Sequence, residues 1–397
     1  MLIYKPLPFG TALVLVAVLA GCGGGGGSAA ASAGLPTETS LSAQAALGEK
    51  IFSDATLSAS GKQSCAGCHS ADNAHAPANG LAVQLGGVMS DEQGKRASPS
   101  INYQSFNGAF FFAADGTPTG GFFLDGRAAS LKDQAGQPLL GSTEMANASK
   151  ALVIEKLARA SYAEEFKRVF GADIFKRPDD AFERVTLALQ QYQREDVDFR
   201  PFTSKYDEFL RGNVALSATE LRGLALFNNP GKGNCAACHP SAKRADGSLP
   251  LFTDFSYDNL GVPRNKAIAR NADAGYFDLG LCERAELATR SDLCGAFKVP
   301  TLRNVAQRQV FFHNGAFTTL KDALTFYVQR DTQPQKWYPL NADGSVNKFD
   351  DLPPKYRGNV NTTEAPYNRK PGEAPALDDA EIDELIAFLK TLSDGYR

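Results

Sequence analysis

The sequence contains Cys65-Ala66-Gly67-Cys68-His69 and, in the other half of the chain, Cys235-Ala236-Ala237-Cys238-His239. Both stretches have the form CxxCH, which is the attachment signature of a c-type haem. The two cysteines of such a motif form thioether bonds to the haem, and the adjacent histidine ligates the iron. The sequence therefore predicts two covalently bound c-type haems and a redox function.

A CxxC pair by itself also occurs in zinc sites and in thioredoxin-like redox proteins. A zinc site needs four converging ligands, whereas each cysteine pair here has its own adjacent histidine and is far from the other pair in the sequence. A thiol redox pair needs no histidine directly after it, yet both pairs have one. The spacing therefore favours haem over either alternative.

Residues 1–22 have the pattern of a lipoprotein-type secretory signal peptide, with an apolar core that is too short to span a membrane stably. The peptide ends in Leu19-Ala20-Gly21-Cys22, which resembles the bacterial lipobox, where cleavage leaves the cysteine as a lipidated N-terminus. Residues 23–40 are rich in glycine, alanine and serine and indicate a flexible tether. We expect Cys22 to anchor a periplasmic protein to a bacterial membrane, the outer membrane being the expected one. A plain signal peptide with an incidental cysteine is the alternative.

The remaining cysteines indicate the cellular compartment, and the net charge limits the possible binding partners. The chain has seven cysteines, of which the haem motifs use four and the lipobox one, leaving Cys282 and Cys294. Export to an oxidising compartment favours a disulfide between them over two free thiols. The formal net charge is −3, so the composition shows no footprint for binding nucleic acid.

Apolar residues recur at three- and four-residue steps, which predicts helices over residues 150–169, 180–195 and 378–392. Similar short apolar stretches precede the two haem motifs and indicate an internal duplication. No sustained alternation indicates a sheet, and residues 333–375 predict a long surface loop. We expect a mostly α-helical protein of two cytochrome c-like haem domains with long loops, residues 41–212 and 213–397.

Two longer stretches resemble the bacterial di-haem cytochrome c peroxidases and their MauG branch. The first is Phe123-Leu124-Asp125-Gly126-Arg127-Ala128, followed by Gln134, Pro138 and Glu144. The second is Phe297-Lys298-Val299-Pro300-Thr301-Leu302-Arg303-Asn304-Val305, leading to Phe312-His313-Asn314-Gly315. The resemblance covers nearly everything after the tether.

The resemblance implies that the N-terminal haem is the peroxidatic one. His69 would be its proximal ligand, and the far side of the iron would stay open for peroxide. Gln134, Pro138 and Glu144 would surround that open face, with Glu144 moving a proton between the peroxide oxygens and Gln134 holding the ligand. His75 follows His69 too closely to reach the opposite face, so we interpret it as a loop histidine.

For the C-terminal haem, His239 would be proximal, and the family implies a methionine or, in the MauG branch, a tyrosine on the other side. The methionines here are Met1, Met89 and Met145, so the C-terminal half has none. Tyr327 stands where the family places that ligand. Two alternatives stay open: His313 as the ligand, and Tyr327 as an ordinary residue of a helix over residues 320–328.

The chain departs from the family pattern at two places. Leu124 stands where the family usually has a tryptophan between the haems, which puts fast sharing of oxidation between the irons in doubt. The family also binds calcium through an asparagine side chain and two backbone carbonyls, and the corresponding positions are Ala97, Arg308 and Val310. An alanine cannot replace the asparagine ligand, so calcium is a weak expectation.

The resemblance therefore implies a peroxidase that reduces hydrogen peroxide at the N-terminal haem and draws electrons through the C-terminal haem. We expect the electrons to come from a partner protein that is oxidised in a MauG-like reaction. One alternative is a peroxide-scavenging cytochrome c peroxidase supplied by a small redox protein. A second is an electron-transfer cytochrome without catalysis.

Overall fold

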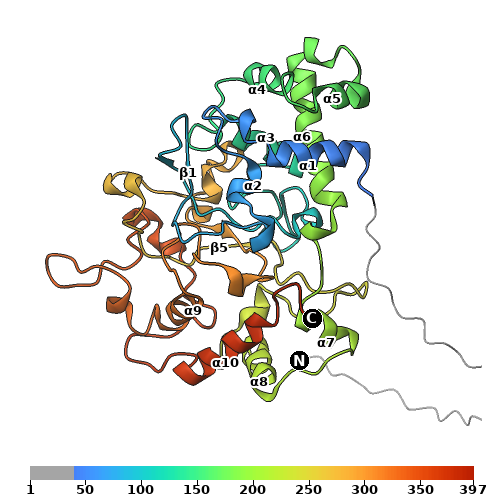
Figure 1. Cartoon of the computed structure of the whole chain (residues 1–397). Coiled ribbons are helices and arrows are strands. Elements are labelled where there is room, and N and C mark those ends of the chain that lie inside the picture. Colours follow the sequence, from blue (N-terminus) through green and yellow to red (C-terminus); the bar gives the residue numbers. More distant parts are fainter. Residues whose placement is uncertain (1–39) are drawn as a thin grey trace, which may run out of the picture. The chain divides into compact units, whose positions relative to one another are not determined.

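Two pairs of packed helices organise residues 40–397, which are the residues that the computed structural model describes. Helix α1 (Ala43–Ser53) packs on α6 (Pro178–Glu195), and α8 (Ala218–Asn228) packs on α10 (Asp379–Lys390). Figure 1 shows α1 lying across α6, and α10 beside α8. The predicted signal peptide, Cys22 and nearly all of the tether lie outside the described residues.

A glycine permits the close approach in each pair. A Cβ atom at Gly48 of α1 would overlap the backbone carbonyl of Ala188 in α6. A Cβ atom at Gly223 of α8 would overlap the backbone carbonyl of Glu384 in α10 in the same way. Because a backbone atom cannot move aside as a flexible side chain can, only glycine fits at these two crossings.

The fold is helix-rich with small antiparallel sheets, so this coarser part of the fold prediction is confirmed. The other helices are α2 (Cys65–Cys68), α3 (Leu131–Leu140), α4 (Lys150–Leu157), α5 (Ala163–Phe170), α7 (Lys205–Arg211) and α9 (Leu320–Gln329). The strand pairs are β1 (Leu85–Gly86) with β2 (Glu92–Gln93), β3 (Phe111–Phe112) with β4 (Pro118–Thr119), and β5 (Tyr257–Asp258) with β6 (Phe297–Lys298). None of the helices within residues 40–397 combines the length and apolar character needed to cross a membrane.

The predicted helix over residues 150–169 is wrong in one respect, because the chain forms two helices there. Helix α4 ends at Leu157 and α5 begins at Ala163. The intervening turn carries Tyr162, whose hydroxyl donates a 2.7 Å hydrogen bond to Asp54. A tertiary contact therefore interrupts an apolar pattern that would suit one continuous helix. By contrast, the capping box of Asp378 and Glu381 starts α10 as its sequence predicts.

Apolar side chains gather into two large cores that divide along the sequence. One core is built from buried residues between Leu47 and Phe199, and the other from buried residues between Tyr206 and Leu392. The predicted surface loop over residues 333–375 is more than a surface feature. It contributes Tyr338 and Phe349 to the second core, so much of this irregular segment is fixed by packing.

Residues on either side of this division are joined by buried polar contacts. Across it, the ammonium of Lys298 donates a buried 2.5 Å hydrogen bond to the carbonyl of Gly121. Within the second part of the chain, Arg303 and Asp207 form a fully buried ion pair, with guanidinium-to-carboxylate distances of 2.8 and 2.9 Å. Tyr103 from the first half donates to Asp394 near the C-terminus, and Asn304 donates to the same carboxylate. The two halves of the chain are therefore locked to one another by directional bonds.

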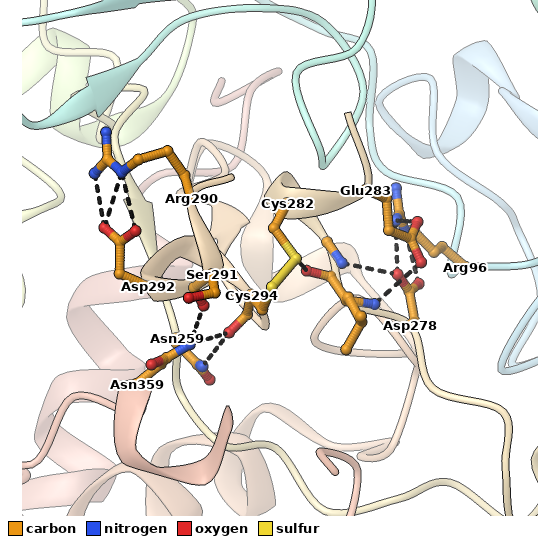
Figure 2. Close-up of a disulfide and its surroundings, with 12 residues drawn as sticks. Arg96, Asn259, Asp278, Cys282, Glu283, Arg290, Ser291, Asp292, Cys294 and Asn359 are labelled. Carbon is orange, nitrogen blue, oxygen red and sulfur yellow. Dashed lines mark hydrogen bonds and ion pairs between the residues drawn. A yellow bond between two sulfur atoms is a disulfide. The ribbon is translucent and has the colours of Figure 1, made fainter. Parts of the chain in front are cut away.

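A disulfide joins Cys282 to Cys294, with a Cα-to-Cα distance of 4.8 Å. Beside it, Arg96 donates bonds of 2.7 Å to both carboxylate oxygens of Asp278 (Figure 2). Burial alone would raise the pKa of Asp278, but Arg96 holds that pKa well below its usual range. Glu283, inside the loop that the disulfide closes, also accepts a 3.3 Å bond from Arg96, so this loop presents a charged group to the first half.

We expect Gly48→Ala to destabilise the protein by about 1–3 kcal/mol, because the added methyl group overlaps the backbone of α6. Urea unfolding of the haem-loaded protein, followed by circular dichroism, measures the change. Gly358→Ala is the matched control, since its added Cβ meets nothing within 4 Å. Equal stability of the two variants would contradict the steric explanation of the helix crossing.

Candidate haem sites and peroxidase pocket

A cavity of about 650 Å³ lies inside the described part of the chain and reaches both CxxCH motifs. Its lining residues that belong to the motifs are Cys65, Cys68, His69, Cys235, Cys238 and His239. These four cysteines form no disulfide, unlike Cys282 and Cys294, so their sulfur atoms can attach haem.

The first motif histidine is oriented by a backbone carbonyl. The Nδ1 atom of His69 lies 3.1 Å from the carbonyl oxygen of His75. A carbonyl only accepts hydrogen bonds, so Nδ1 carries the proton and Nε2 keeps a lone pair for a metal. The same carbonyl accepts a bond from the backbone N–H of Ile101, and the hydroxyl of Ser100 donates to the carbonyl of Ala74.

The second motif histidine has the same arrangement. The Nδ1 atom of His239 lies 2.7 Å from the carbonyl oxygen of Phe252, which also accepts from the N–H of Leu302. The hydroxyl of Thr301 donates to the carbonyl of Leu251, as Ser100 does to Ala74 in the first site. The two halves therefore repeat one hydrogen-bond pattern around each histidine.

The carbonyl-bearing residues have an uncommon backbone conformation. His75 has φ +49° and Phe252 has φ +52°, both in the left-handed region that non-glycine residues seldom adopt. The ring of His75 is held by a 2.7 Å hydrogen bond to Asn102 and by stacking on Phe199 at 3.9 Å. These contacts fix His75 beside His69, in agreement with its interpretation as a loop histidine.

Burial determines the protonation of the motif residues in the polypeptide. Burial lowers the pKa of His69 to about 4 and also lowers that of His239, so both imidazoles are neutral, as an iron ligand must be. Burial raises the pKa of Cys65 and of Cys235 to about 12, so both are neutral thiols in the polypeptide alone. Within residues 40–397, no three histidine, cysteine or acidic side chains converge as a metal-binding group.

The three residues predicted for the open face of the first haem lie on the wall of the same cavity. Gln134 and Pro138 belong to α3, and Glu144 follows in the turn after that helix. The turn is tight because the N–H of Glu144 donates to the carbonyl of Gly141, where a Cβ would overlap the Glu144 carboxylate. The backbone N–H of Gly87, at the tip of the β1–β2 hairpin, donates to the carbonyl of Glu144 and fixes the turn from outside.

The electrostatic setting of Glu144 favours its neutral form. Removal from water raises the pKa of Glu144 above its ordinary value, and the nearby Arg127 opposes this shift without cancelling it. Arg127 itself binds both oxygens of Asp125 and the side-chain oxygen of Gln137. The charge of Arg127 is therefore shared with other acceptors, which leaves the pKa of Glu144 above its ordinary value and the carboxyl able to take and release a proton.

Two tyrosines lie on the cavity wall near the second motif. Tyr327 lies on α9 and Tyr367 on the irregular segment after it, with ring centroids 5.9 Å apart. Removal from water raises the pKa of Tyr327 well above its usual range, and the nearby acidic groups Asp258, Cys235 and Cys238 add to the shift. Tyr367 was not predicted from the sequence, because it follows a stretch with no helical or strand pattern.

His313 also reaches the cavity wall, but its ring has other contacts. It stacks on Phe297 with centroids 3.7 Å apart, and its Nε2 lies 3.5 Å from a carboxylate oxygen of Asp351. Leu124 and Ala97 line the same cavity. The backbone N–H of Ala97 donates to the carbonyl of His313, which is not one of the positions expected for calcium.

A protein whose cavity presents two CxxCH motifs, each with a carbonyl-held histidine, is a c-type cytochrome with two haem sites. The family profile described as "Di-haem cytochrome c peroxidase" matches residues 42–215. The chain is 36% identical over 363 residues to the methylamine utilization protein MauG of Paracoccus denitrificans, covering 89% of each chain. It is 32% identical to a cytochrome c551 peroxidase of Nitrosomonas europaea, covering 70% of this chain and 71% of that protein.

Solved structures give the same relationship. The crystal structure of the diheme peroxidase BthA from Burkholderia thailandensis matches with a TM-score of 0.83 and 39% identity, covering 90% of this chain and 88% of that one. The chain belongs to the di-haem cytochrome c peroxidase and MauG family. It is a peroxidase-type oxidoreductase that carries two covalently bound c-type haems.

We expect Asn102→Ala to alter the first haem selectively, because it removes the side chain that holds His75 in its left-handed conformation. Loss of this buried hydrogen bond costs about 1–3 kcal/mol of stability. Electron paramagnetic resonance of the ferric protein measures the first haem's signal, which should change while the signal of the second haem stays constant. Asn213→Ala is an exposed control, and a spectrum equal to that control would refute the positioning role of Asn102.

Proposed function

We propose that the N-terminal haem, held by Cys65, Cys68 and His69, reduces hydrogen peroxide with its far side open. The C-terminal haem, held by Cys235, Cys238 and His239, delivers the electrons. The overall reaction takes two electrons and two protons and converts one peroxide molecule into two water molecules. The observation that carries this proposal is the group of Glu144, Gln134 and Pro138 on one wall of the cavity that His69 also lines.

When bound, the haem iron supplies the site at which peroxide gains electrons. The work of this chain's residues is proton transfer and positioning. With haem in place, the carboxylate of Glu144 would take a proton from one peroxide oxygen and return it to the other, so that the second oxygen could leave as water. The side-chain amide of Gln134 can donate a hydrogen bond to the bound peroxide, and the ring of Pro138 offers no competing ligand.

The second haem is proposed to be closed by the phenol oxygen of Tyr327. Its support is the position of Tyr327 on the cavity wall near Cys235 and Cys238, together with the lack of methionine in residues 146–397. The contacts of His313 with Phe297 and Asp351 make it the weaker candidate. An anionic oxygen ligand stabilises oxidised iron, which suits a haem that passes on oxidising power.

We propose further that residues 41–212 and 213–397 are two haem domains and that Cys22 carries a lipid anchor. The division of the apolar cores near residue 200 supports the first statement. The disulfide between Cys282 and Cys294 supports export to an oxidising compartment, which the periplasm provides. Calcium has no support from the alanine at position 97.

The electron source is proposed to be a residue of a partner protein, as in a MauG-like reaction, because MauG of Paracoccus denitrificans is among the relatives with high coverage. Peroxide scavenging with a small redox protein is the second candidate, favoured by the peroxidase relatives. Peroxide consumption with reduced cytochrome c as the only donor separates them. Rapid turnover supports scavenging, and its absence supports oxidation of a partner protein. Failure to consume peroxide with any donor would support the non-catalytic cytochrome.

Glu144→Gln should slow peroxide reduction by about 10²–10⁴-fold, since the amide cannot take a proton. The proposed role needs the ionised carboxylate, so the wild-type rate should fall as the pH drops through the raised pKa of Glu144. This acid limb should start at a higher pH than the ordinary glutamate value and be lost in the variant. Stopped-flow rates from pH 4 to 9 measure both effects, with the exposed Glu49→Gln as control. A wild-type rate in Glu144→Gln would exclude this role.

Tyr327→Phe removes the proposed oxygen ligand but keeps the ring, so the low-spin signal of the second haem should change in the ferric electron paramagnetic resonance spectrum. Tyr367→Phe is the matched comparison, because this ring lines the same cavity 5.9 Å away. A changed low-spin signal in Tyr367→Phe, together with an unchanged signal in Tyr327→Phe, would show that Tyr367 is the ligand. Unchanged spectra in both variants would exclude both tyrosines.

A further inference from the structure

We propose that the guanidinium of Arg308 binds a carboxylate group of the first haem, although Arg308 belongs to the C-terminal half of the chain. A haem carries two propionate side chains that are anionic at neutral pH. The inference rests on haem attachment at the first CxxCH motif and not on which electron donor the protein uses.

Arg308 lines the cavity and is poorly satisfied by the protein itself. Its Nη2 atom donates one 3.0 Å hydrogen bond to the carbonyl of Ser98. Its Nη1 atom is enclosed but has no hydrogen-bond partner within residues 40–397. No carboxylate in this part of the chain lies within ion-pair distance of the guanidinium. Since a guanidinium offers five N–H donors, most of its bonding capacity is unused.

Other arginines at this cavity have anionic partners. Arg96 is bonded to Asp278 and Asp125, and Arg303 is bonded to both oxygens of Asp207. Arg308 differs from these two arginines, because burial lowers its pKa to about 10 and no acidic group nearby raises that pKa again. The enclosed Nη1 atom of Arg308 is a cationic donor without an acceptor in the described chain, so an anion brought into the cavity would be bound there.

The location of Arg308 identifies the haem concerned. Its acceptor Ser98 directly precedes Pro99, whose carbonyl lies beside the ring of His69. The charge of Arg308 also helps to lower the pKa of His69, after the larger effect of burial. Arg308 therefore lies near the first motif, within the cavity that the first haem must occupy.

Protein groups around the cavity do not provide an alternative partner. The shifted pKa of Glu144 is opposed by Arg127, and Arg308 is not among its influences. Lys298 is the other buried cation on this wall without an ion pair in the described chain, but its ammonium donates a 2.5 Å bond to the carbonyl of Gly121. Compared with Arg96, Arg303 and Lys298, Arg308 is therefore the cation with the fewest partners in the described chain.

The test is a redox titration of the haem-loaded protein between pH 5 and 9, with Arg308→Gln, Arg308→Lys and the control Lys95→Gln. Lys95 lines the same cavity but already has Asp278 and Glu283 as partners. Loss of the cation next to a propionate should lower the reduction potential of the first haem. It should also raise the propionate pKa, so that this potential falls with rising pH over a range in which the wild type is flat.

Arg308→Lys should restore most of the wild-type behaviour, and the second haem should be less affected than the first. A first-haem potential and pH profile in Arg308→Gln equal to those of Lys95→Gln would overturn the proposal. Dependence of the wild-type potential on added acetate would also overturn it, because the site would then hold a free anion. Peroxidase activity is not the readout, so failure of the proposed catalytic role leaves this test intact.

If Arg308→Gln fails to load haem, a crystal structure of the wild-type haem-loaded protein decides the question. A guanidinium nitrogen within 3.2 Å of a propionate oxygen of the first haem supports the proposal, since this is hydrogen-bond distance. Propionates directed away from Arg308 overturn it.

Discussion

The hydrogen bond from each motif histidine to a backbone carbonyl is the constraint on which the structure depends. It fixes the tautomer and the plane of the ring, and so decides where a metal can bind. The carbonyls belong to His75 and Phe252, whose left-handed backbone is held by neighbouring side-chain and backbone bonds. His75 also packs on an aromatic ring of α1 and Phe252 on aromatic rings of α8 and α10, and these helices belong to the pairs that require Gly48 and Gly223. The glycines at the two helix crossings and the motif histidines in the cavity are therefore connected by one series of contacts.

The same arrangement occurs twice, but the opposite cavity walls differ. Near the first motif the wall carries a carboxyl group with a raised pKa, an amide and a proline. Near the second motif it carries two phenols whose pKa values lie far above the usual range, so they are protonated in the polypeptide alone. Under the proposed function, the wall near the first motif would move a proton, and the wall near the second would supply an oxygen ligand. The two sites could therefore differ in function although the hydrogen-bond pattern around their motif histidines is the same.

Much of this was predictable from the sequence because the signals are local. CxxCH places thiols and imidazole within five residues, and the box of Asp378 and Glu381 starts its helix by bonds three residues apart. The break between α4 and α5 was missed because the bond of Tyr162 to Asp54 is a tertiary contact. Tyr367 and the environment of Arg308 were missed for the same reason. Both depend on irregular segments whose position is set by packing, which periodicity does not encode.

The locked contact between the halves bears on communication between the two haem sites. Leu124 offers no indole between the sites, so a tryptophan relay at this position is excluded. Connections between the halves remain, namely the bond of Tyr103 to Asp394 and the bond of Lys298 to the carbonyl of Gly121. Such bonds hold the separation of the sites constant, and electron transfer over a fixed distance needs less structural rearrangement than transfer across a mobile joint. An arginine from one half that binds the haem of the other would add a charge-assisted bond to this connection and tie cofactor loading to the docking of the halves.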